Sequence, residues 1–436
     1  MSVHSVARPA RRLLSPSVLT VCIMLLLGIV AALGAIALSG TKIGVALALF
    51  VVFGPIAAYA AFASPLVFPF CLFILLVPFD NLLEFSSFGT ATKGVGVLCG
   101  AAIVLWLIRT RRYVVPDRAL LAWLPFVLLA IASFAWAADP AMGLPTLSTL
   151  VASFGLYGAL SFFPINRRTL SVVVAAVIAG GAIAATYGSY LFHRGIGVSQ
   201  DGRLFIGGDG SGRIDPNHFA AALLLPLALA ISAVIESRRF TVRVLAAVAL
   251  VLLSAGIVIA GSRGSIVAVV AMIVYLFVRS RKRLLLGGIA FAGLAAGLVL
   301  FGKIADRFSQ IAATGGAGRL GVWKVSLAAF WLHPIAGMGF GNFQVAYNNV
   351  FLTVPAFASM KIIEGARWNM NPHNNIVWVA VELGILGVVA FLYAWWAQFR
   401  TLRSIAPESD LYSLRVALEA ALIALFVASM FLGTVN

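Results

Sequence analysis

The sequence has few charged residues and few cysteines for its length. Of 436 residues, 10% are charged and 62% are hydrophobic, whereas soluble domains average about a quarter charged and roughly 45–50% apolar residues. This composition excludes an ordinary soluble protein and predicts that lipid surrounds most of the chain. The three cysteines, Cys22, Cys71 and Cys99, lie inside apolar runs and are odd in number, which excludes a disulfide framework and a thiolate metal cluster.

Several catalytic motifs are also missing. The chain has no P-loop and no Gly-x-Ser-x-Gly elbow, which argues against an ATP-driven pump and a serine hydrolase. It has no His-Glu-x-x-His motif and no Asp-x-Asp spacing on the expected outer side. We therefore expect neither a bound metal nor another cofactor. Because four histidines, His193, His218, His333 and His373, share that side, a zinc site stays an open alternative.

The apolar runs predict an all-α polytopic membrane protein with about 12–13 transmembrane helices, forming a single integral membrane domain over residues 1–436. The runs lie at 18–38, 43–64, 65–83, 94–108, 119–137, 144–163, 170–191, 217–235, 243–261, 264–278, 284–302, 375–396 and 411–433. The first follows three arginines and is too long for a removable signal peptide. We expect it to be a signal anchor.

The net charge of +17 is explained by membrane topology. If the amino terminus is cytoplasmic, nineteen of the 31 lysines and arginines fall on the inner side, and nearly every short inner turn carries at least two. This distribution follows the positive-inside rule and fixes the expected orientation. We expect no nucleic-acid partner, because the basic clusters alternate with spans and do not form one basic face.

Two long connections lie on the opposite, outer side, at residues 192–216 and 303–374. Long loops on a rigid scaffold are where binding and catalytic residues concentrate, so we expect the function there. Within the second loop, a helical apolar period over 320–332 predicts an amphipathic helix at the outer leaflet. A glycine-rich stretch from Gly337 to Gly341 predicts a turn.

His373 is the main candidate catalytic residue. It lies in "NPHNN", between Pro372 and Asn374, at the expected amino end of a span. A helix start offers free N–H groups and a positive dipole end to an anion. An imidazole there, with a pKa near neutrality, can act as a general base for a hydroxyl group. The alternative is a histidine that only caps the helix or bonds to a loop carbonyl.

Three arginines are candidate phosphate ligands. Arg263 lies in "AGSRGS", at a break between two apolar runs, where a guanidinium needs an anionic partner or a wet cavity. Arg203 and Arg213 precede a helix start at which Asp215 and Asn217 are expected to form the cap. The alternative for Arg263 is a side chain that extends to the membrane interface. The alternative for Arg203 and Arg213 is an exposed loop in which both are solvated. Which of Arg203 and Arg213 binds phosphate stays open.

Two acids, Glu382 and Glu419, lie alone within expected spans. A proton-coupled transporter uses such residues. Most spans, however, carry no ionisable group, so the chain offers few residues for a continuous proton or ion path across the bilayer. We expect Glu382 to have a structural role. It would either form a hydrogen bond to a neighbouring helix or lie in a polar cavity under the outer loop.

Four segments resemble the O-antigen ligase and O-antigen polymerase superfamily of bacterial envelope enzymes. They are "RIDPNHFAAALLLPLALA", "AGSRGSIVAVV", "RLGVWKVSLAAFWLHPIAGMGFGNF" and "NPHNNIVWVAVELGILG". They occur in the family's order over roughly residues 200–390. The first half of the chain agrees with the family only in being apolar.

The resemblance implies a C-type membrane glycosyltransferase in the bacterial inner membrane, with its active site on the periplasmic face. The donor would be a glycan on undecaprenyl pyrophosphate and the acceptor a glycan or lipid A-core. His373 would activate the acceptor, with Asn374 beside it. Arg263, and Arg203 or Arg213, would hold the pyrophosphate, with transfer inverting and metal-independent. A polymerase of the same superfamily is one alternative, and a flippase or transporter of lipid-linked glycan is another.

Overall fold

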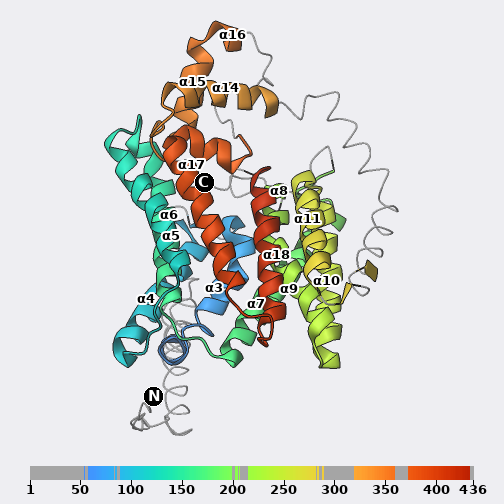
Figure 1. The fold of residues 1–436 in the computed structure, drawn as a ribbon. Helices are drawn as coiled ribbons and strands as arrows, with labels where there is room; N and C mark the ends of the chain where they lie inside the picture. The colour runs from blue at the N-terminus through green and yellow to red at the C-terminus, as the bar shows by residue number, and fades with distance from the viewer. Residues whose placement is uncertain are drawn as a thin grey trace, which may run out of the picture.

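The structure is a computed structural model, and it describes most of the chain as helices packed side by side (Figure 1). The described residues are 57–82, 84–85, 89–198, 202–204, 215–280, 319–358 and 372–432, with single positions at 54, 206, 282, 283, 287 and 288.

After the helical residues 57–63, the first half of the described chain carries five labelled α-helices. They are α3 (Phe70–Leu76), α4 (Ala91–Thr110), α5 (Arg118–Ala132), α6 (Pro140–Ser161) and α7 (Arg167–His193). Short 3-10 helices, η1 (Val77–Leu82) and η2 (Ser133–Ala135), and a hairpin of β1 (Glu84–Phe85) and β2 (Gly89–Thr90) lie between them. Capping by Thr90, Asp139 and Asn166 fixes where α4, α6 and α7 begin.

The second half continues the bundle and adds a layer at one end. Its helices are α8 (Pro216–Ala222), α9 (Leu224–Glu236), α10 (Phe240–Ala260), α11 (Arg263–Arg279), α14 (Arg319–Leu332), α15 (Phe343–Thr353), α16 (Pro355–Ala358), α17 (Asn375–Arg403) and α18 (Tyr412–Ser429). In Figure 1, α14 to α16 lie above the upper end of the bundle, and we call them the outer layer.

Eight helices in the described part of the chain are long and apolar enough to cross a membrane. They are α4, α5 with η2, α6, α7, α8 with α9, α10, α17 and α18. α11 is apolar over 17 residues and packs along α18. The predicted all-α polytopic membrane fold is thus confirmed.

One predicted span has a different structure. Residues 65–83 were expected to form one helix, but α3 has seven residues and passes directly into η1. Pro69 precedes α3 and Pro78 lies at the start of η1, and a proline has no N–H group for a helical hydrogen bond. The spans predicted at 18–38 and 284–302, and most of the one at 43–64, lie outside the described residues.

The bundle has two chemically different ends. The basic helix ends gather at one of them, where Arg167 meets Asp410 at 2.6 Å and the Tyr412 hydroxyl donates to the Arg279 carbonyl at 3.3 Å. The outer layer covers the opposite end (Figure 1). The long loop predicted at 303–374 therefore contains helices, and α14 coincides with the predicted helix at 320–332.

Candidate active site at the outer end

Several helices begin at the outer end of the bundle, α8, α11 and α17 among them, and the last helix ends there (Figure 1). A Cβ placed on Gly264, the second residue of α11, would lie 2.4 Å from the Cβ of Phe431, just after α18. Leu432 then lines one cavity together with Ala221 of α8 and Asn375, the first residue of α17. The starts of α11 and α17 are therefore brought to one region by the end of α18, and the last turn of the short helix α8 lies beside them.

The start of α8 positions Arg203. The Asp215 side chain caps α8 by accepting a hydrogen bond from the Asn217 backbone N–H at 2.7 Å. The buried Asn217 side chain in turn accepts from Nη2 of Arg203 at 3.0 Å. This guanidinium is thus held at the positive end of α8, where an anion is favoured. Arg213 lies outside the described residues.

Arg263 is the first residue of α11. The chain leaves α10 through Gly261, whose φ of 61° suits a glycine, and Ser262 caps α11 by accepting from the Ser265 N–H at 3.3 Å. A guanidinium at this position adds to the positive end of the helix dipole. The position therefore favours a negatively charged ligand such as a phosphate.

His373 lies in a constrained segment before α17. Its φ is 48°, a left-handed conformation that is unusual outside glycine and is found preferentially at functional sites. Asn374 caps α17 by accepting from two backbone N–H groups at 3.0 and 3.2 Å. On the other side, Nε1 of Trp323 in α14 donates to the Pro372 carbonyl at 2.7 Å. The half-buried imidazole thus has its backbone fixed on both sides.

Glu382 binds the glycine-rich turn of the outer end, residues 333–342, which we call the glycine turn. The Glu382 side chain is completely buried in α17. Its Oε2 accepts from the Gly341 N–H and its Oε1 from the Phe343 N–H, both at 2.9 Å. One carboxylate therefore accepts the backbone N–H groups both at the end of the glycine turn and at the start of α15.

α17 is broken at Gly384, where φ is 63° and ψ is −162°. On one side of the break, the carbonyls of Val381 and Glu382 accept N–H groups of the glycine turn at 3.1 and 2.9 Å. On the other side, the N–H groups of Ile385 and Leu386 donate to carbonyls of the turn at 2.9 and 3.3 Å. The turn thus replaces the helical hydrogen bonds that the break removes, which makes irregular backbone tolerable inside a membrane protein.

The contact between the glycine turn and α17 leaves no room for side chains. A Cβ on Gly384 would lie 2.3 Å from the Ile335 carbonyl oxygen, and one on Gly337 would lie 2.3 Å from the backbone of α17. The turn is also held from its other side, because the Phe340 N–H donates to the Ser133 hydroxyl at 2.9 Å. It is therefore fixed between the α5–α6 corner and the helix that follows His373.

A cavity of about 400 Å³ lies directly below the glycine turn. It runs between α5, α6, α17 and α18, with the Phe340 ring and Asn375 near the outer layer, and most of its lining is apolar. The lining residues include Trp123, Phe126, Leu150, Phe391, Trp395 and Leu425. A space of this kind accommodates apolar chains better than sugars.

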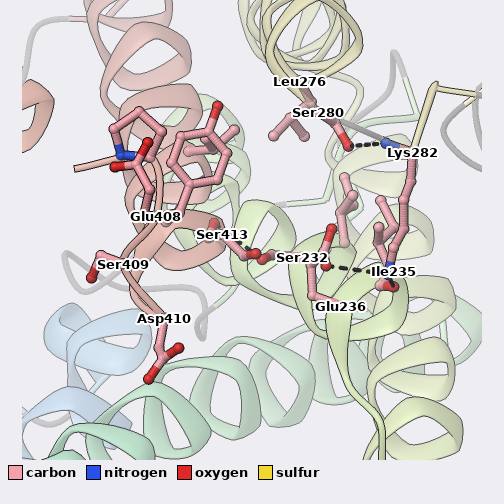
Figure 2. Close-up of a pocket in the computed structure, with 14 residues that line it drawn as sticks. Ser232, Ile235, Glu236, Leu276, Ser280, Lys282, Glu408, Ser409, Asp410 and Ser413 are labelled. Carbon is pink, nitrogen blue, oxygen red and sulfur yellow. Dashed lines mark hydrogen bonds and ion pairs between the residues drawn. The ribbon is translucent and has the colours of Figure 1, made fainter. Parts of the chain in front are cut away.

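A second cavity, of about 320 Å³, lies at the basic end between α9, α11 and α18 (Figure 2). Its most prominent polar pair is Lys282 and Glu236, with 3.2 Å between Nζ and Oε2. The residues predicted for catalysis lie at the other end of the bundle, so this cavity does not belong to the predicted site.

Taken together, the outer end carries a guanidinium bonded to the first turn of α8, a second at the first position of α11, and a histidine just before α17. Such groups can hold a diphosphate and accept a proton from a hydroxyl group. Within the described ranges, no three His, Cys, Asp or Glu side chains gather closely enough to hold a metal ion. The expectation of metal-independent chemistry stays a prediction.

Comparison with known proteins gives a family match in the second half of the chain. Residues 248–392 match the family model described as O-antigen ligase, which confirms the resemblance over that segment. A protein of Rickettsia felis named "Putative polysaccharide ligase" is 31% identical over 104 residues. This stretch covers 22% of the present chain and 24% of that protein, so the chain spans about a quarter of the length of the curated relative it matches.

The matched segment contains only part of the predicted site. It includes Arg263, His373 and Glu382, together with the glycine turn and the break in α17. Arg203 and the α8 cap lie before its first residue, so their place in the site rests on the geometry alone.

Proposed function

Since residues 248–392 match the O-antigen ligase family, we propose that this membrane protein is a C-type glycosyltransferase. It transfers a glycan from undecaprenyl pyrophosphate to a hydroxyl group of lipid A-core, as an O-antigen ligase does. The observation that carries the proposal is the meeting of the starts of α11 and α17 with the end of α18 at the outer end, inside or directly beside the matched segment.

Arg263 and Arg203 are the proposed ligands of the donor pyrophosphate, with Arg213 as a further candidate. Arg263 is the first residue of α11, and the Arg203 guanidinium bonds Asn217 in the first turn of α8, so a helix dipole adds to the charge of each. Pyrophosphate leaves with the electron pair of the broken C–O bond. Fixed cations at this position stabilise the charge that develops on its bridging oxygen.

His373 is the proposed base. The acceptor oxygen attacks the anomeric carbon, His373 takes the hydroxyl proton, and the bond to pyrophosphate breaks in the same step. A direct displacement inverts the anomeric centre. Asn374 and Trp323 support this role because they fix the backbone on either side of the imidazole.

The proposed orientation places the outer layer in the periplasm and the amino terminus in the cytoplasm, with the protein in the bacterial inner membrane. The basic residues at the opposite end of the bundle support it through the positive-inside rule. The apolar cavity below the glycine turn is then at a depth that suits the first isoprene units of the donor.

The base assignment is tested with purified protein and an undecaprenyl-pyrophosphate glycan. We expect His373→Ala to lower the transfer rate by roughly 10²–10⁴-fold, the usual contribution of a general base. His193→Ala is the matched control, since His193 is an exposed histidine at the end of α7. A His373→Ala protein that transfers glycan at the original rate would refute the assignment.

The acceptor is tested separately. The same donor is offered lipid A-core in one reaction and further lipid-linked repeat units in another. Attachment to lipid A-core supports a ligase, and elongation of the repeat identifies a polymerase. If no product forms and the donor only changes leaflet in vesicles, the protein is a transporter.

A further inference from the structure

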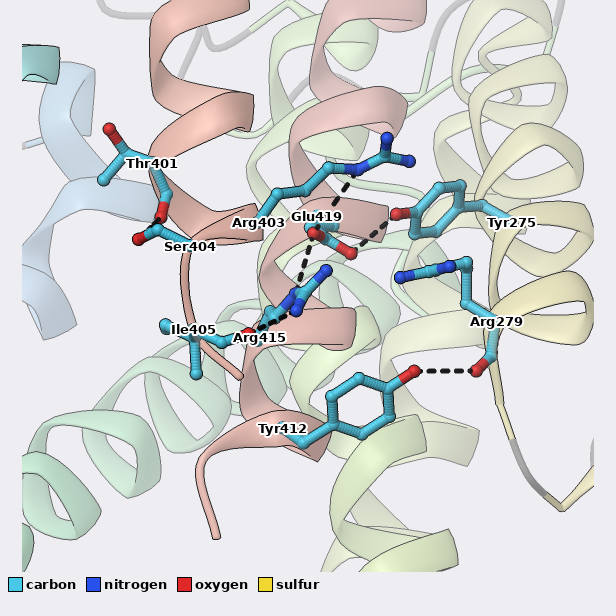
Figure 3. A network of polar contacts seen from close by, with 9 residues as sticks. All are labelled: Tyr275, Arg279, Thr401, Arg403, Ser404, Ile405, Tyr412, Arg415 and Glu419. Atoms are coloured by element: carbon cyan, nitrogen blue, oxygen red, sulfur yellow. Dashed lines mark hydrogen bonds and ion pairs between the residues drawn. The ribbon is translucent and has the colours of Figure 1, made fainter. Parts of the chain in front are cut away.

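Three arginines surround one buried glutamate at the basic end of the bundle (Figure 3). Glu419 has no exposed surface, and its Oε1 lies 3.0 Å from Nε of Arg415 and 3.9 Å from Nε of Arg403. The Tyr275 hydroxyl donates to the other carboxylate oxygen at 2.6 Å. Figure 3 shows Arg279 pointing toward the same group from α11. We call Arg279, Arg403 and Arg415 the arginine cluster.

The arginine cluster carries more positive charge than its surroundings balance. Three guanidiniums face one carboxylate, which leaves two positive charges in excess. α11 ends at Arg279 and α17 at Arg403, and each helix end contributes only about half a negative charge. Of the acids at this end, Glu236 and Asp410 already have cationic partners, Lys282 and Arg167, and the exposed Glu408 makes no ion pair with the arginine cluster within the described residues. About one positive charge therefore stays unbalanced.

This excess is located on Arg279 and Arg403. Arg415 is fully engaged, because it bonds both Glu419 and the Ile405 carbonyl. Nε of Arg279 is buried, and among the residues that the structure describes it has no hydrogen-bond acceptor. A buried donor without an acceptor is rare, because it loses the hydrogen bonds that water would provide. Arg403 keeps half of its side chain exposed, so a ligand can reach it.

We propose that Arg279 and Arg403 bind a phosphate group, and that its source in the membrane is an anionic phospholipid of the leaflet at the basic end. The two side chains approach the Tyr275 hydroxyl from different helices (Figure 3). Guanidinium groups bind phosphate oxygens in pairs, and basic pockets between helices at this depth face lipid headgroups. The site lies at the opposite end from His373, so it does not depend on the proposed catalysis.

The test uses the full-length protein in dodecyl maltoside micelles, which contain no phosphate, with unfolding followed by tryptophan fluorescence. Dioleoyl-phosphatidylglycerol, phosphatidylcholine and inorganic phosphate are titrated separately. We expect phosphatidylglycerol to raise the unfolding temperature. Arg279→Gln and Arg403→Gln should each weaken this effect by roughly tenfold or more in lipid concentration, as for the loss of a charge-assisted hydrogen bond.

Arg168→Gln is the control, since Arg168 is an exposed arginine at the same end, and it should titrate like the unchanged protein. If inorganic phosphate reproduces the arginine-dependent shift, the site binds phosphate from either source. If both cluster variants titrate like Arg168→Gln, the proposal is wrong. Arg403 is half exposed and its substitution should not prevent folding, so this variant decides the matter even if Arg279→Gln cannot be purified.

Discussion

Substitution of Glu382 by glutamine should loosen the glycine turn without changing the size of the side chain. The carboxylate accepts two backbone N–H groups, from Gly341 and Phe343, each at 2.9 Å. An amide keeps one acceptor oxygen and places an NH2 group against the second donor. One buried N–H then loses its partner, which costs about 1–3 kcal/mol. Local opening should therefore become roughly 5- to 150-fold more frequent.

Hydrogen–deuterium exchange measures this opening directly. In Glu382→Gln, amides of the glycine turn and of the first half of α17 should exchange faster by that factor, and glycan transfer should fall because the segment after His373 is less fixed. Glu408→Gln is the control, since Glu408 is an exposed acid at the basic end. Unchanged exchange together with lost transfer would refute the structural role and indicate that the carboxylate takes part in chemistry.

Three further substitutions test other contacts. Gly384→Ala should abolish the monodisperse peak in size-exclusion chromatography, because its Cβ would lie 2.3 Å from a carbonyl oxygen, whereas Gly100→Ala has open space and should behave normally. Trp323→Phe removes the N–H that donates at 2.7 Å to the Pro372 carbonyl, just before the proposed base His373. Glycan transfer should slow several-fold with the unfolding temperature nearly unchanged, while substitution of the exposed Trp331 by phenylalanine should have no effect. Glu419→Gln leaves buried arginine charge without its counter-ion, and thermal unfolding should show a loss of about 3–5 kcal/mol; an unchanged transition would contradict the buried ion pair.

The sequence predicted the fold class well, because membrane helices are specified locally. Length and hydropathy identify a span, and caps such as Asp215 and Asn374 mark its first residue. The prediction was wrong for residues 65–83, where an apolar run is interrupted by prolines. Hydropathy averages over such a run and does not register the missing N–H groups.

The candidate site was predicted less completely, because its contacts join distant segments. The positions of Arg263 and His373 at helix starts follow from the sequence, whereas the bond from Trp323 to the Pro372 carbonyl spans 49 residues and has no local signal. Glu419 was interpreted as an isolated acid, although Arg415 lies four residues before it on the same helix face. That spacing was visible and would have predicted the ion pair.

The break at Gly384 has a consequence for how the protein can move. From Ile385 to Arg403, α17 is about 28 Å long at 1.5 Å per residue, close to the hydrocarbon thickness of a bilayer. The eight residues from Asn375 to Glu382 are bonded to the glycine turn through the Val381 and Glu382 carbonyls and the Glu382 side chain. The same turn also accepts the N–H groups of Ile385 and Leu386 and bonds Ser133. A displacement of the imidazole-bearing segment would therefore be passed on to the transmembrane helices, and the break couples the two parts instead of separating them.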